Sequence, residues 1–534
     1  MIFYNFFILI KKKLRNIYQN SRFYEKKISK TFDVNFEYKP SPHLLSSIIK
    51  YQNKKYKIEN FSIDSIWKKK LSLKDYKKLN NFYWFFSLDL KSSKKDSQKI
   101  INNWILNNEK YKKDSWEFDI TAKRIISWLS NHQLTYEDSN KEYRLKFDHM
   151  VQKQTNHLLN ELKNSKEIGN KIIGCVAIIL AGLAYRNQKI YLDSGLGFLK
   201  NIIKHSIDNQ GFPKSRSIQQ LISYLKYFIL IREWFKEAQI TIPDQINETI
   251  NYLGQGYAFV WQKINSDILF NGNNISNNFE FDNYLKRFGY TFKNENRECG
   301  GYVVLKNKKI SLIMDIGNSP NKNFSKNYQA GVMSVEIISN GKKLITNCGY
   351  HNNENLKLNE LSKSTATHNT LIIDDNSSCH FKKNENNFVL KDEIKILKKE
   401  IIFEKNYWKI KASHNGYQKK YNSIHEREIE FFPDQNRFVG KDKILNKHTN
   451  FNVKFDIRFH LEPGVKLMKT QDNKTILIEL MDEGWKFTCD NFNINIDNGL
   501  YFGNKNSYIQ NQNIFISGIA NKQNENINWQ LIKI

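Results

Sequence analysis

Residues 327–350 read NYQAGVMSVEIISNGKKLITNCGY, and residues 364–378 read STATHNTLIIDDNSS. In the first stretch, side chains alternate with a period of two on both sides of Asn340-Gly341, a dipeptide that strongly favours a tight hairpin turn. We therefore predict a β-hairpin there. The second stretch places His368 beside Asn369 and Thr370, next to a further predicted strand. We therefore expect this region to carry functional residues as well as to indicate the fold.

Similar short apolar runs continue from Gly301 towards the C-terminus, separated by Asn, Gly and Asp turns. Runs of four to eight residues with such turns predict an all-β region of about 230 residues. The runs are YVVL, ISLIMDI, MSVEIIS, KLITN, TLIID, WKIKASH, REIEFF, FDIRFHL, TILIEL and IFISGIA.

The first half of the chain has a different period. Between Ile63 and Gln262, apolar residues recur at helical spacing, as in the sets Trp84, Phe85 and Leu88, or Ile172, Val176, Ile179 and Leu180. This spacing predicts successive amphipathic helices. The helical period ends in an Asn- and Gly-rich run between residues 271 and 296. We predict an N-terminal extension (1–62), a helical domain (63–275) and a β domain (276–534), because helices followed by strands form separate stacked domains.

The composition limits the possible partners. The 534 residues include 83 Lys and Arg against 54 Asp and Glu, which gives a formal net charge of +29. Such a charge attracts polyanions, although an excess of Lys over Arg also fits a general compositional bias. Nucleic acid would satisfy the same charge, but no nucleic-acid-binding motif accompanies it, and we expect no nucleic-acid partner. Five scattered cysteines predict neither a disulfide framework nor a zinc motif.

The N-terminus reads MIFYNFFILIKKKLRN, in which the apolar residues precede the basic ones. A secretory signal has the opposite order and ends in small residues. A bilayer-spanning helix needs about 20 apolar residues, and this run is shorter. Two interpretations remain: a segment in peripheral contact with a membrane surface, or a first core helix.

Three groups of residues carry a family resemblance: Asn327-Tyr328-Gln329-Ala330-Gly331, Asn347-Cys348-Gly349 and Ala366-Thr367-His368-Asn369-Thr370. They resemble the C-terminal domain of the heparinase II/III family, where the corresponding elements are usually His-Ala-His-Ala-Asp, Asp-Ser-Gly and Ala-Ala-His-Asn-Thr. DITAKRIISWL, QTNHLLNELKNS, GFPKSRS, LFNG and IRFHLEP look like further landmarks of that family. The resemblance implies an N-terminal (α/α) toroid followed by a C-terminal antiparallel β-sandwich, with an active cleft between them.

In this family a lyase acts on a uronic-acid polymer by β-elimination. It must neutralise the sugar carboxylate, remove the neighbouring proton and protonate the departing oxygen. The resemblance assigns Asn156 and His157 to the carboxylate, with His157 also able to act as a base or acid. A helical histidine is equally well explained as a buried structural residue.

The segment DNQGFPKSRSIQQLISYLKYF supplies the next candidates. Relatives carry a catalytic Tyr soon after an Arg-Ser-Pro or similar tripeptide, but here Arg216-Ser217-Ile218 is followed by two amides, Gln219 and Gln220. Tyr224 lies one helical turn further on and is the candidate acid or base, although it also fits an ordinary helix face. Lys214 and Arg216 are candidate anion contacts, because Arg pairs with carboxylate or sulfate in a bidentate fork.

Many relatives hold a metal at positions that correspond here to Gln329, Asn347 and His368. Neutral amides are poor zinc ligands, so we predict no metal and no cofactor. Gln329 is then a candidate substrate contact and His368 a candidate catalytic residue. Alternatively, these side chains form a hydrogen-bonded polar cluster. His425 and His460 lie in predicted strands and are interpreted as structural.

These observations favour a polysaccharide lyase-like protein of the bacterial cell envelope or periplasm, acting on an acidic polysaccharide. The replaced positions favour an alternative, a non-catalytic glycan-binding or biosynthesis-associated protein with a degenerate site. A cytoplasmic location and any oligomeric state remain compatible with the sequence.

Overall fold

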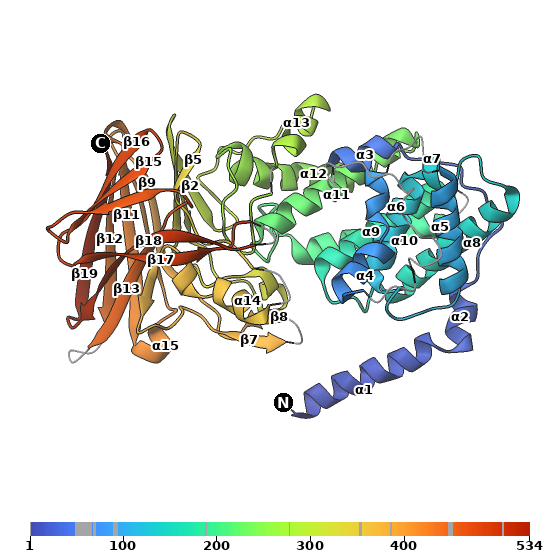
Figure 1. The fold of residues 1–534 in the computed structure, drawn as a ribbon, viewed down its shortest axis with the longest axis horizontal. Helices are drawn as coiled ribbons and strands as arrows, with labels where there is room; N and C mark the ends of the chain where they lie inside the picture. The colour runs from blue at the N-terminus through green and yellow to red at the C-terminus, as the bar shows by residue number, and fades with distance from the viewer. Residues whose placement is uncertain are drawn as a thin grey trace. The chain divides into compact units, whose positions relative to one another are not determined.

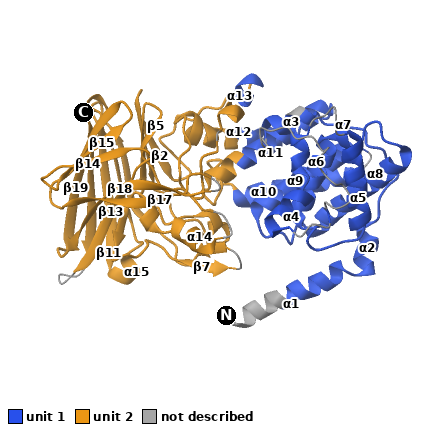
Figure 2. Ribbon diagram, in the orientation of Figure 1, with its two compact units in different colours: residues 1–206, 223–251, 283–288 blue, residues 207–222, 252–282, 289–534 orange. Residues whose placement is uncertain are grey.

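The computed structural model describes residues 2–48, 67, 71–88, 94–186, 189–276, 278–351, 355–384, 387–446, 452–504 and 507–534. The chain divides into two compact units (Figure 2). Unit 1 comprises residues 1–206, 223–251 and 283–288, and unit 2 comprises residues 207–222, 252–282 and 289–534. The division therefore differs from the predicted boundaries, because residues 207–222 and 252–275 group with the β-strands. Residues 49–62 of the predicted N-terminal extension lie outside the described residues.

Unit 1 is built from helices (Figure 1). They are α1 Ile2–Gln19, α2 Arg22–Ile28, α3 Pro42–Ile48, α4 Leu73–Asn80, η2 Tyr83–Ser87, α5 Lys94–Asn108, α6 Phe118–Ser130, α7 His132–Thr135, α8 Lys141–Glu161, α9 Ile168–Ala184 and α10 Lys189–Ser206, with parts of α11 Ile218–Glu237, α12 Asp244–Tyr257 and α13 Phe279–Arg287. Trp84 and Phe85 lie in the 3-10 helix η2 rather than in an α-helix. The preceding Phe82 has a φ of 58°, which interrupts regular α geometry.

Helix α9 forms the centre of unit 1, and its side chains from Gly174 to Ala184 are buried. An ideal Cβ added to Gly182 would lie 2.7 Å from the backbone nitrogen of Leu192, so glycine permits α9 and α10 to approach closely. Arg124 of α6 is also buried, with its Nε donating to Gln154 Oε1 at 2.7 Å. Its guanidinium carbon lies 4.0 Å from the centre of the Trp104 ring. Burial of this charge is thus compensated by hydrogen bonds and a cation–π contact.

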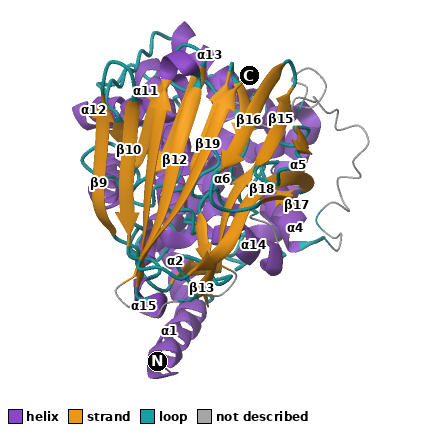
Figure 3. Cartoon of the chain, turned by 90° about the vertical axis from the view of Figure 1, so that its left-hand side faces the viewer, coloured by secondary structure: helices purple, strands orange, loops and turns teal. Residues whose placement is uncertain are grey.

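Among the described residues, unit 2 contains four sheets, and their strand pairs are antiparallel. The largest has the order β14-β15-β16-β19-β12-β11-β10-β9 (Figure 3). A second has the order β1-β2-β3-β4-β5, a third β17-β18-β13-β6, and β7 pairs with β8. The strands are β1 Glu298–Cys299, β2 Tyr302–Lys306, β3 Ile310–Asp315, β4 Val335–Ser339, β5 Lys342–Ile345, β6 Leu371–Ile373, β7 Phe381–Asn384, β8 Asn387–Leu390, β9 Ile396–Phe403, β10 Trp408–His414, β11 Ser423–Phe432, β12 Arg437–Asn446, β13 Val453–His460, β14 Lys466–Lys469, β15 Thr475–Leu480, β16 Glu483–Cys489, β17 Ile494–Tyr501, β18 Ile509–Ala520 and β19 Asn524–Lys533.

The predicted hairpin is present between β4 and β5. Asn340 and Gly341 have φ values of 47° and 76°, and Ser339 pairs with Lys342. Positive φ at both central residues is what a type I′ turn requires. The side chains of β4 are all buried, so the hairpin belongs to the core of unit 2.

The apolar core of unit 2 joins side chains from several sheets. Phe459 of β13 lies with its ring centre 4.9 Å from that of Phe487 and 4.8 Å from that of Trp529. β13 belongs to the four-stranded sheet, whereas Phe487 and Trp529 come from the eight-stranded sheet. The two sheets therefore pack face to face, as in a β-sandwich.

Candidate functional site

The predicted carboxylate-binding pair on α8 is fully occupied by protein contacts. The Nδ2 of Asn156 donates to the carbonyl oxygens of Ile28 and Lys30, both at 2.9 Å, and Tyr191 donates to its Oδ1 at 3.0 Å. These bonds fix the chain that follows α2 against α8. The structure therefore contradicts the expectation that Asn156 is free to bind a sugar carboxylate.

His157 is buried, and both ring nitrogens are paired. Its Nε2 lies 2.9 Å from the carbonyl oxygen of Trp116, which requires a proton on Nε2, so the Tyr24 hydroxyl donates to Nδ1 at 2.7 Å. Burial lowers the pKa of the imidazole to about 4. Tyr24 and Trp116, both buried themselves, thus occupy the two ring nitrogens of His157. This contradicts the expected catalytic or carboxylate-binding role of His157.

Replacing Tyr24 by Phe tests this structural role. We expect the free energy of unfolding to fall by about 1–3 kcal/mol, because the buried Nδ1 of His157 would lose its donor. Denaturant-induced unfolding followed by fluorescence measures the change. Tyr18→Phe is the matched control on exposed α1 and should change stability by less than about 0.5 kcal/mol. Equal stabilities of the two variants would contradict a structural role for the Tyr24–His157 pair.

Tyr224 does not provide an accessible base either. Its side chain is buried in unit 1, and burial raises the pKa of the hydroxyl above its ordinary value. Gln220, one of the two amides that follow the Arg216-Ser217-Ile218 segment, accepts a hydrogen bond from the Ser215 hydroxyl at 2.6 Å. Tyr224 is therefore a core residue of α11, and its predicted catalytic role is contradicted.

The residues that correspond to the family metal positions are bonded to the surrounding backbone. The Oε1 of Gln329 accepts from Gly272 N at 2.9 Å, and its Nε2 donates to the carbonyl oxygens of Gly349 and Ser362 at 3.0 and 2.6 Å. Asn347 Oδ1 accepts from Asn369 N at 3.0 Å. Gln329 is buried and is therefore not the substrate contact that was predicted.

His368 is buried in the loop before β6, and its Nδ1 lies 2.8 Å from the carbonyl oxygen of Ser364. Burial lowers the pKa of this imidazole to about 4. An ideal Cβ on Gly331 would lie 2.3 Å from the ring, so only glycine fits there. His368 is thus part of a buried polar framework, and its predicted catalytic role is contradicted. Within the described residues, no group of three or more His, Cys, Asp or Glu side chains is arranged to hold a metal.

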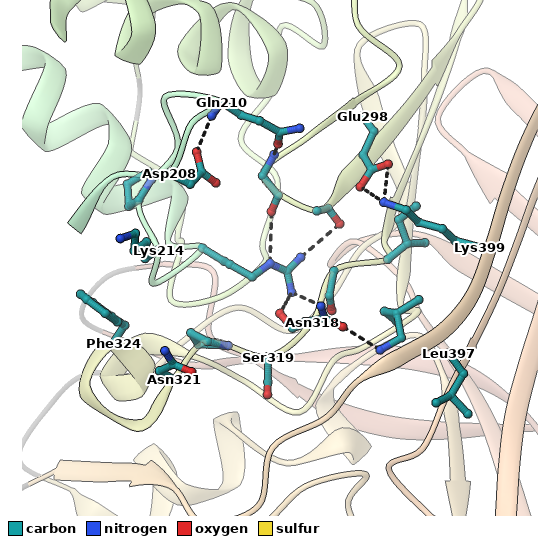
Figure 4. Close-up of a pocket in the computed structure, with 18 of the residues that line it drawn as sticks. Asp208, Gln210, Lys214, Glu298, Asn318, Ser319, Asn321, Phe324, Leu397 and Lys399 are labelled. Carbon is teal, nitrogen blue, oxygen red and sulfur yellow. Dashed lines mark hydrogen bonds and ion pairs between the residues drawn. The ribbon is translucent and has the colours of Figure 1, made fainter. Parts of the chain in front are cut away.

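A cavity of about 490 Å³ lies within unit 2, around the 207–217 loop that precedes α11 (Figure 4). The loop is shaped by Asp208, whose Oδ1 accepts from the backbone nitrogens of Gln210 and Phe212 at 2.9 and 2.8 Å. Gly211 has a φ of 77°, and a Cβ there would lie 2.4 Å from the Tyr252 carbonyl oxygen. These local bonds hold the following Lys214 and Arg216 at the cavity wall.

Arg216 forms the floor of this cavity. Its Nη2 pairs with Asp315 Oδ1 at 2.6 Å, and its remaining donors reach four carbonyl oxygens between 3.1 and 3.3 Å away: those of Gly300, Gly301, Gly317 and Asn318. The guanidinium joins the 207–217 loop to two other segments of unit 2. Because its donors are already engaged, the predicted role of Arg216 as a direct anion contact is contradicted.

Lys214 remains a candidate anion contact, since its side chain is exposed and lines the cavity. Two further lysines, Lys398 and Lys399, line the opposite part, and Lys399 Nζ lies 2.6 Å from Glu298 Oε1. Burial raises the pKa of the Asp208 carboxyl, which makes this group a possible proton carrier. The cavity therefore combines basic side chains with one perturbed carboxyl group.

Sequence reasoning found Lys214 and Arg216 but missed the other wall residues. The Asp208-Asn209-Gln210-Gly211 turn was visible as a turn, and its neighbouring Lys214 was a usable signal. Glu298 of β1 and Lys399 of β9 are 101 residues apart in the sequence and come from different sheets. No local pattern could have linked them to Asp208.

Helices followed by an antiparallel β-sandwich place the chain in the toroid-and-sandwich class of folds. Residues 296–530 match the family described as Heparinase II/III-like, C-terminal. This part of the chain is therefore a heparinase II/III-like C-terminal domain, and the predicted fold class is confirmed.

Solved structures match the fold over most of the chain. A crystal structure of heparinase III matches with a TM-score of 0.69 and 15% identity, covering 95% of this chain and 88% of that one. A mutant of the heparan sulfate lyase HepC from Pedobacter heparinus matches with a TM-score of 0.67 and 12% identity, covering 95% and 85%. No curated protein sequence matches the chain. At such identities the comparison establishes the fold.

Proposed function

We propose that this chain is a polysaccharide lyase-like protein that acts on an acidic, uronic-acid-containing polysaccharide by β-elimination. The observation that carries the proposal is the cavity in unit 2, which the exposed Lys214 lines from the loop before α11. Its ammonium would neutralise a sugar carboxylate and so acidify the adjacent C–H bond. The match of residues 296–530 to the heparinase II/III-like C-terminal family supports this substrate class.

In the proposed reaction, a base removes the proton beside the carboxylate, the bond to the glycosidic oxygen breaks, and that oxygen takes up a proton. Asp208 is the group of the cavity with a pKa raised by burial, and we assign the proton transfer to it. Its Oδ1 is held by two backbone N–H groups, which orients the carboxyl. Arg216 acts as a positioning residue, because it fixes the loop that carries Lys214.

A second function is favoured by a specific observation. His157, Tyr224 and His368, which would serve as acid, base or orienting groups, are buried in this structure. A protein that kept the fold and the basic cavity while losing these groups would bind a glycan without cleaving it. We therefore carry non-catalytic glycan binding as the alternative.

Incubation with a panel of polyuronates and glycosaminoglycans separates the two functions. Elimination produces an unsaturated uronate, whose ultraviolet absorbance rises with time. Absorbance that grows with the wild-type chain but not with Asp208→Asn supports the lyase. Binding by calorimetry without any absorbance change supports the alternative. Neither binding nor absorbance across the panel would refute both.

The role of Lys214 is tested by Lys214→Gln. We expect affinity for the acidic polysaccharide to fall about tenfold, because one charge-assisted contact is lost. Lys466→Gln removes an exposed lysine of β14 and is the matched control for the change in net charge. Equal losses in the two variants would indicate unspecific attraction by the basic surface and would contradict a specific contact at Lys214.

A further inference from the structure

Helix α1 is attached to unit 1 by its polar side. Arg15 Nε donates to Glu161 Oε2 at 2.9 Å, and Arg15 Nη2 pairs with the other oxygen of the same carboxylate. Gln19, one turn further along, is buried and accepts a hydrogen bond from the Tyr111 hydroxyl at 3.0 Å. In a water-soluble protein an amphipathic helix normally buries its apolar stripe instead. Helix α1 therefore contacts unit 1 through its polar face, the reverse of the usual orientation of an amphipathic helix.

The apolar side of α1 is correspondingly exposed. Ile10, Leu14, Ile17 and Tyr18 follow the spacing i, i+4, i+7 and i+8, which places them on one helix face. Leu14 and Ile17 are 61% and 60% exposed, and Phe23 of the adjoining α2 is 79% exposed. Such a continuous exposed stripe marks an interaction surface.

Basic side chains border this stripe. Lys11, Lys12 and Lys13 of α1 are exposed, as are Arg22, Lys26 and Lys27 of α2. The acidic residue of this segment, Glu25, is paired with Lys153 of α8. The surface formed by α1 and α2 therefore combines apolar side chains with a positive border. This combination is typical of helices that lie in the interface of a membrane.

We propose that α1 lies on an anionic lipid surface, with its apolar stripe at the boundary of the acyl chains and its lysines among the headgroups. A second copy of the chain is a poorer occupant, because two such helices would bring Lys11–Lys13 of both copies together. The anionic headgroups instead attract them, each Lys adding favourable energy near the surface. Among the described residues, no helix is long and apolar enough to cross a membrane, so the contact is interfacial.

This inference is independent of the proposed lyase function, since it rests on residues of α1 and α2 rather than on the cavity of unit 2. The inference concerns where the protein acts. A chain tethered through α1 would work on polysaccharide that lies close to a lipid surface.

Vesicle flotation of the full chain tests the proposal. The wild-type chain should float with vesicles of phosphatidylcholine and phosphatidylglycerol, bind vesicles of phosphatidylcholine alone more weakly, and be released partly by salt. The double variant Leu14→Gln/Ile17→Gln should bind at least about tenfold more weakly, because two exposed apolar side chains no longer enter the lipid. Both positions are exposed, so folding is preserved and is checked by circular dichroism.

Leu106→Gln/Leu145→Gln is the matched control. These leucines of α5 and α8 are 65% and 53% exposed and lie outside α1, so vesicle binding should stay at the wild-type level. The proposal is overturned if the wild-type chain fails to float with the anionic vesicles, or if the control variant loses as much binding as the α1 variant. It is also overturned if sedimentation shows a dimer that the α1 variant dissociates while lipid binding is absent.

Discussion

Replacing Asp442 by asparagine is expected to lower the free energy of unfolding by about 3–5 kcal/mol. Asp442 of β12 is wholly buried in the eight-stranded sheet, and its Oδ1 accepts from Arg427 Nε at 2.7 Å. Arg427 also donates from Nη2 to Asp442 Oδ2 at 3.1 Å. The asparagine keeps the shape but removes the charge. It therefore leaves the buried guanidinium without its counter-charge. Removing one partner of a buried ion pair destabilises a protein more than replacing both partners by apolar residues.

The neighbouring histidines strengthen this expectation. Gly416 N donates to His414 Nδ1 at 3.0 Å, so the proton of His414 resides on Nε2, which lies 3.2 Å from His425 Nδ1. His425 is then neutral and donates from Nε2 to Asp442 Oδ1 at 2.6 Å. Burial alone would raise the pKa of Asp442, but Arg427 and His425 outweigh it and hold the pKa below its ordinary value. The aspartate is thus charged in the folded protein.

Guanidinium-induced unfolding of Asp442→Asn and of the wild type measures the effect. Glu479→Gln is the matched control in the same sheet, because it breaks the exposed Lys466–Glu479 pair, whose atoms lie 3.0 Å apart. That change should cost less than about 1 kcal/mol. A loss for Asp442→Asn no larger than that of the control would show that the buried network does not stabilise the sheet.

The same network explains part of what the sequence could not reveal. The predicted strands of unit 2 were runs with visible apolar residues, but β12 reads RFVGKDKILN and was missed. Its burial alternates as a half-buried strand should, yet one buried position holds Asp442 instead of an apolar residue. Its burial is compensated by Arg427 and His425, 15 and 17 residues away on β11. Local patterns cannot report such a partner.

In the candidate site, too, some features depend on local sequence and others on residues far away in the chain. The hairpin at Asn340-Gly341 depends on local turn geometry and was predicted correctly. Lys214 and Arg216 share one cavity because they share one loop. Burial of His157, by contrast, depends on Tyr24, 133 residues earlier, and the donors of Arg216 are used by segments 84 to 102 residues later. Residue type indicated the chemistry of these side chains, and long-range packing decided their accessibility.

The second large expected effect is destabilisation by mild acid. Burial lowers the pKa of His157 and His368 to about 4 and that of His460 to about 3. A histidine in the unfolded chain has a pKa of about 6.5, so the unfolded state binds more protons below that pH. The stability that these neutral histidines contribute is fully present above pH 6.5 and is lost as the pH falls towards 4. Each accounts for about 2 kcal/mol at pH 5.

Buried carboxyl groups oppose this trend. Burial raises the pKa of Asp148 to about 6, despite hydrogen bonds from the Tyr136 and Tyr185 hydroxyls at 2.8 Å. The folded state therefore binds a proton at Asp148 before the unfolded state does, which returns about 1 kcal/mol at pH 5. Together, these three histidines and Asp148 are expected to lower the free energy of unfolding by about 4 kcal/mol between pH 7 and pH 5.

Denaturant-induced unfolding at pH 7, 6 and 5 measures this slope, and His460→Gln identifies one of its sources. His460 of β13 lies with Nε2 2.9 Å from the carbonyl oxygen of Ala366, a bond that the glutamine amide can replace. The variant lacks the titrating group, so its loss between pH 7 and pH 5 should be about 2 kcal/mol smaller than that of the wild type. Equal slopes for the two proteins would mean that His460 remains neutral in the unfolded chain or is already protonated in the folded one. Either result would contradict the link between burial and acid sensitivity in this sandwich.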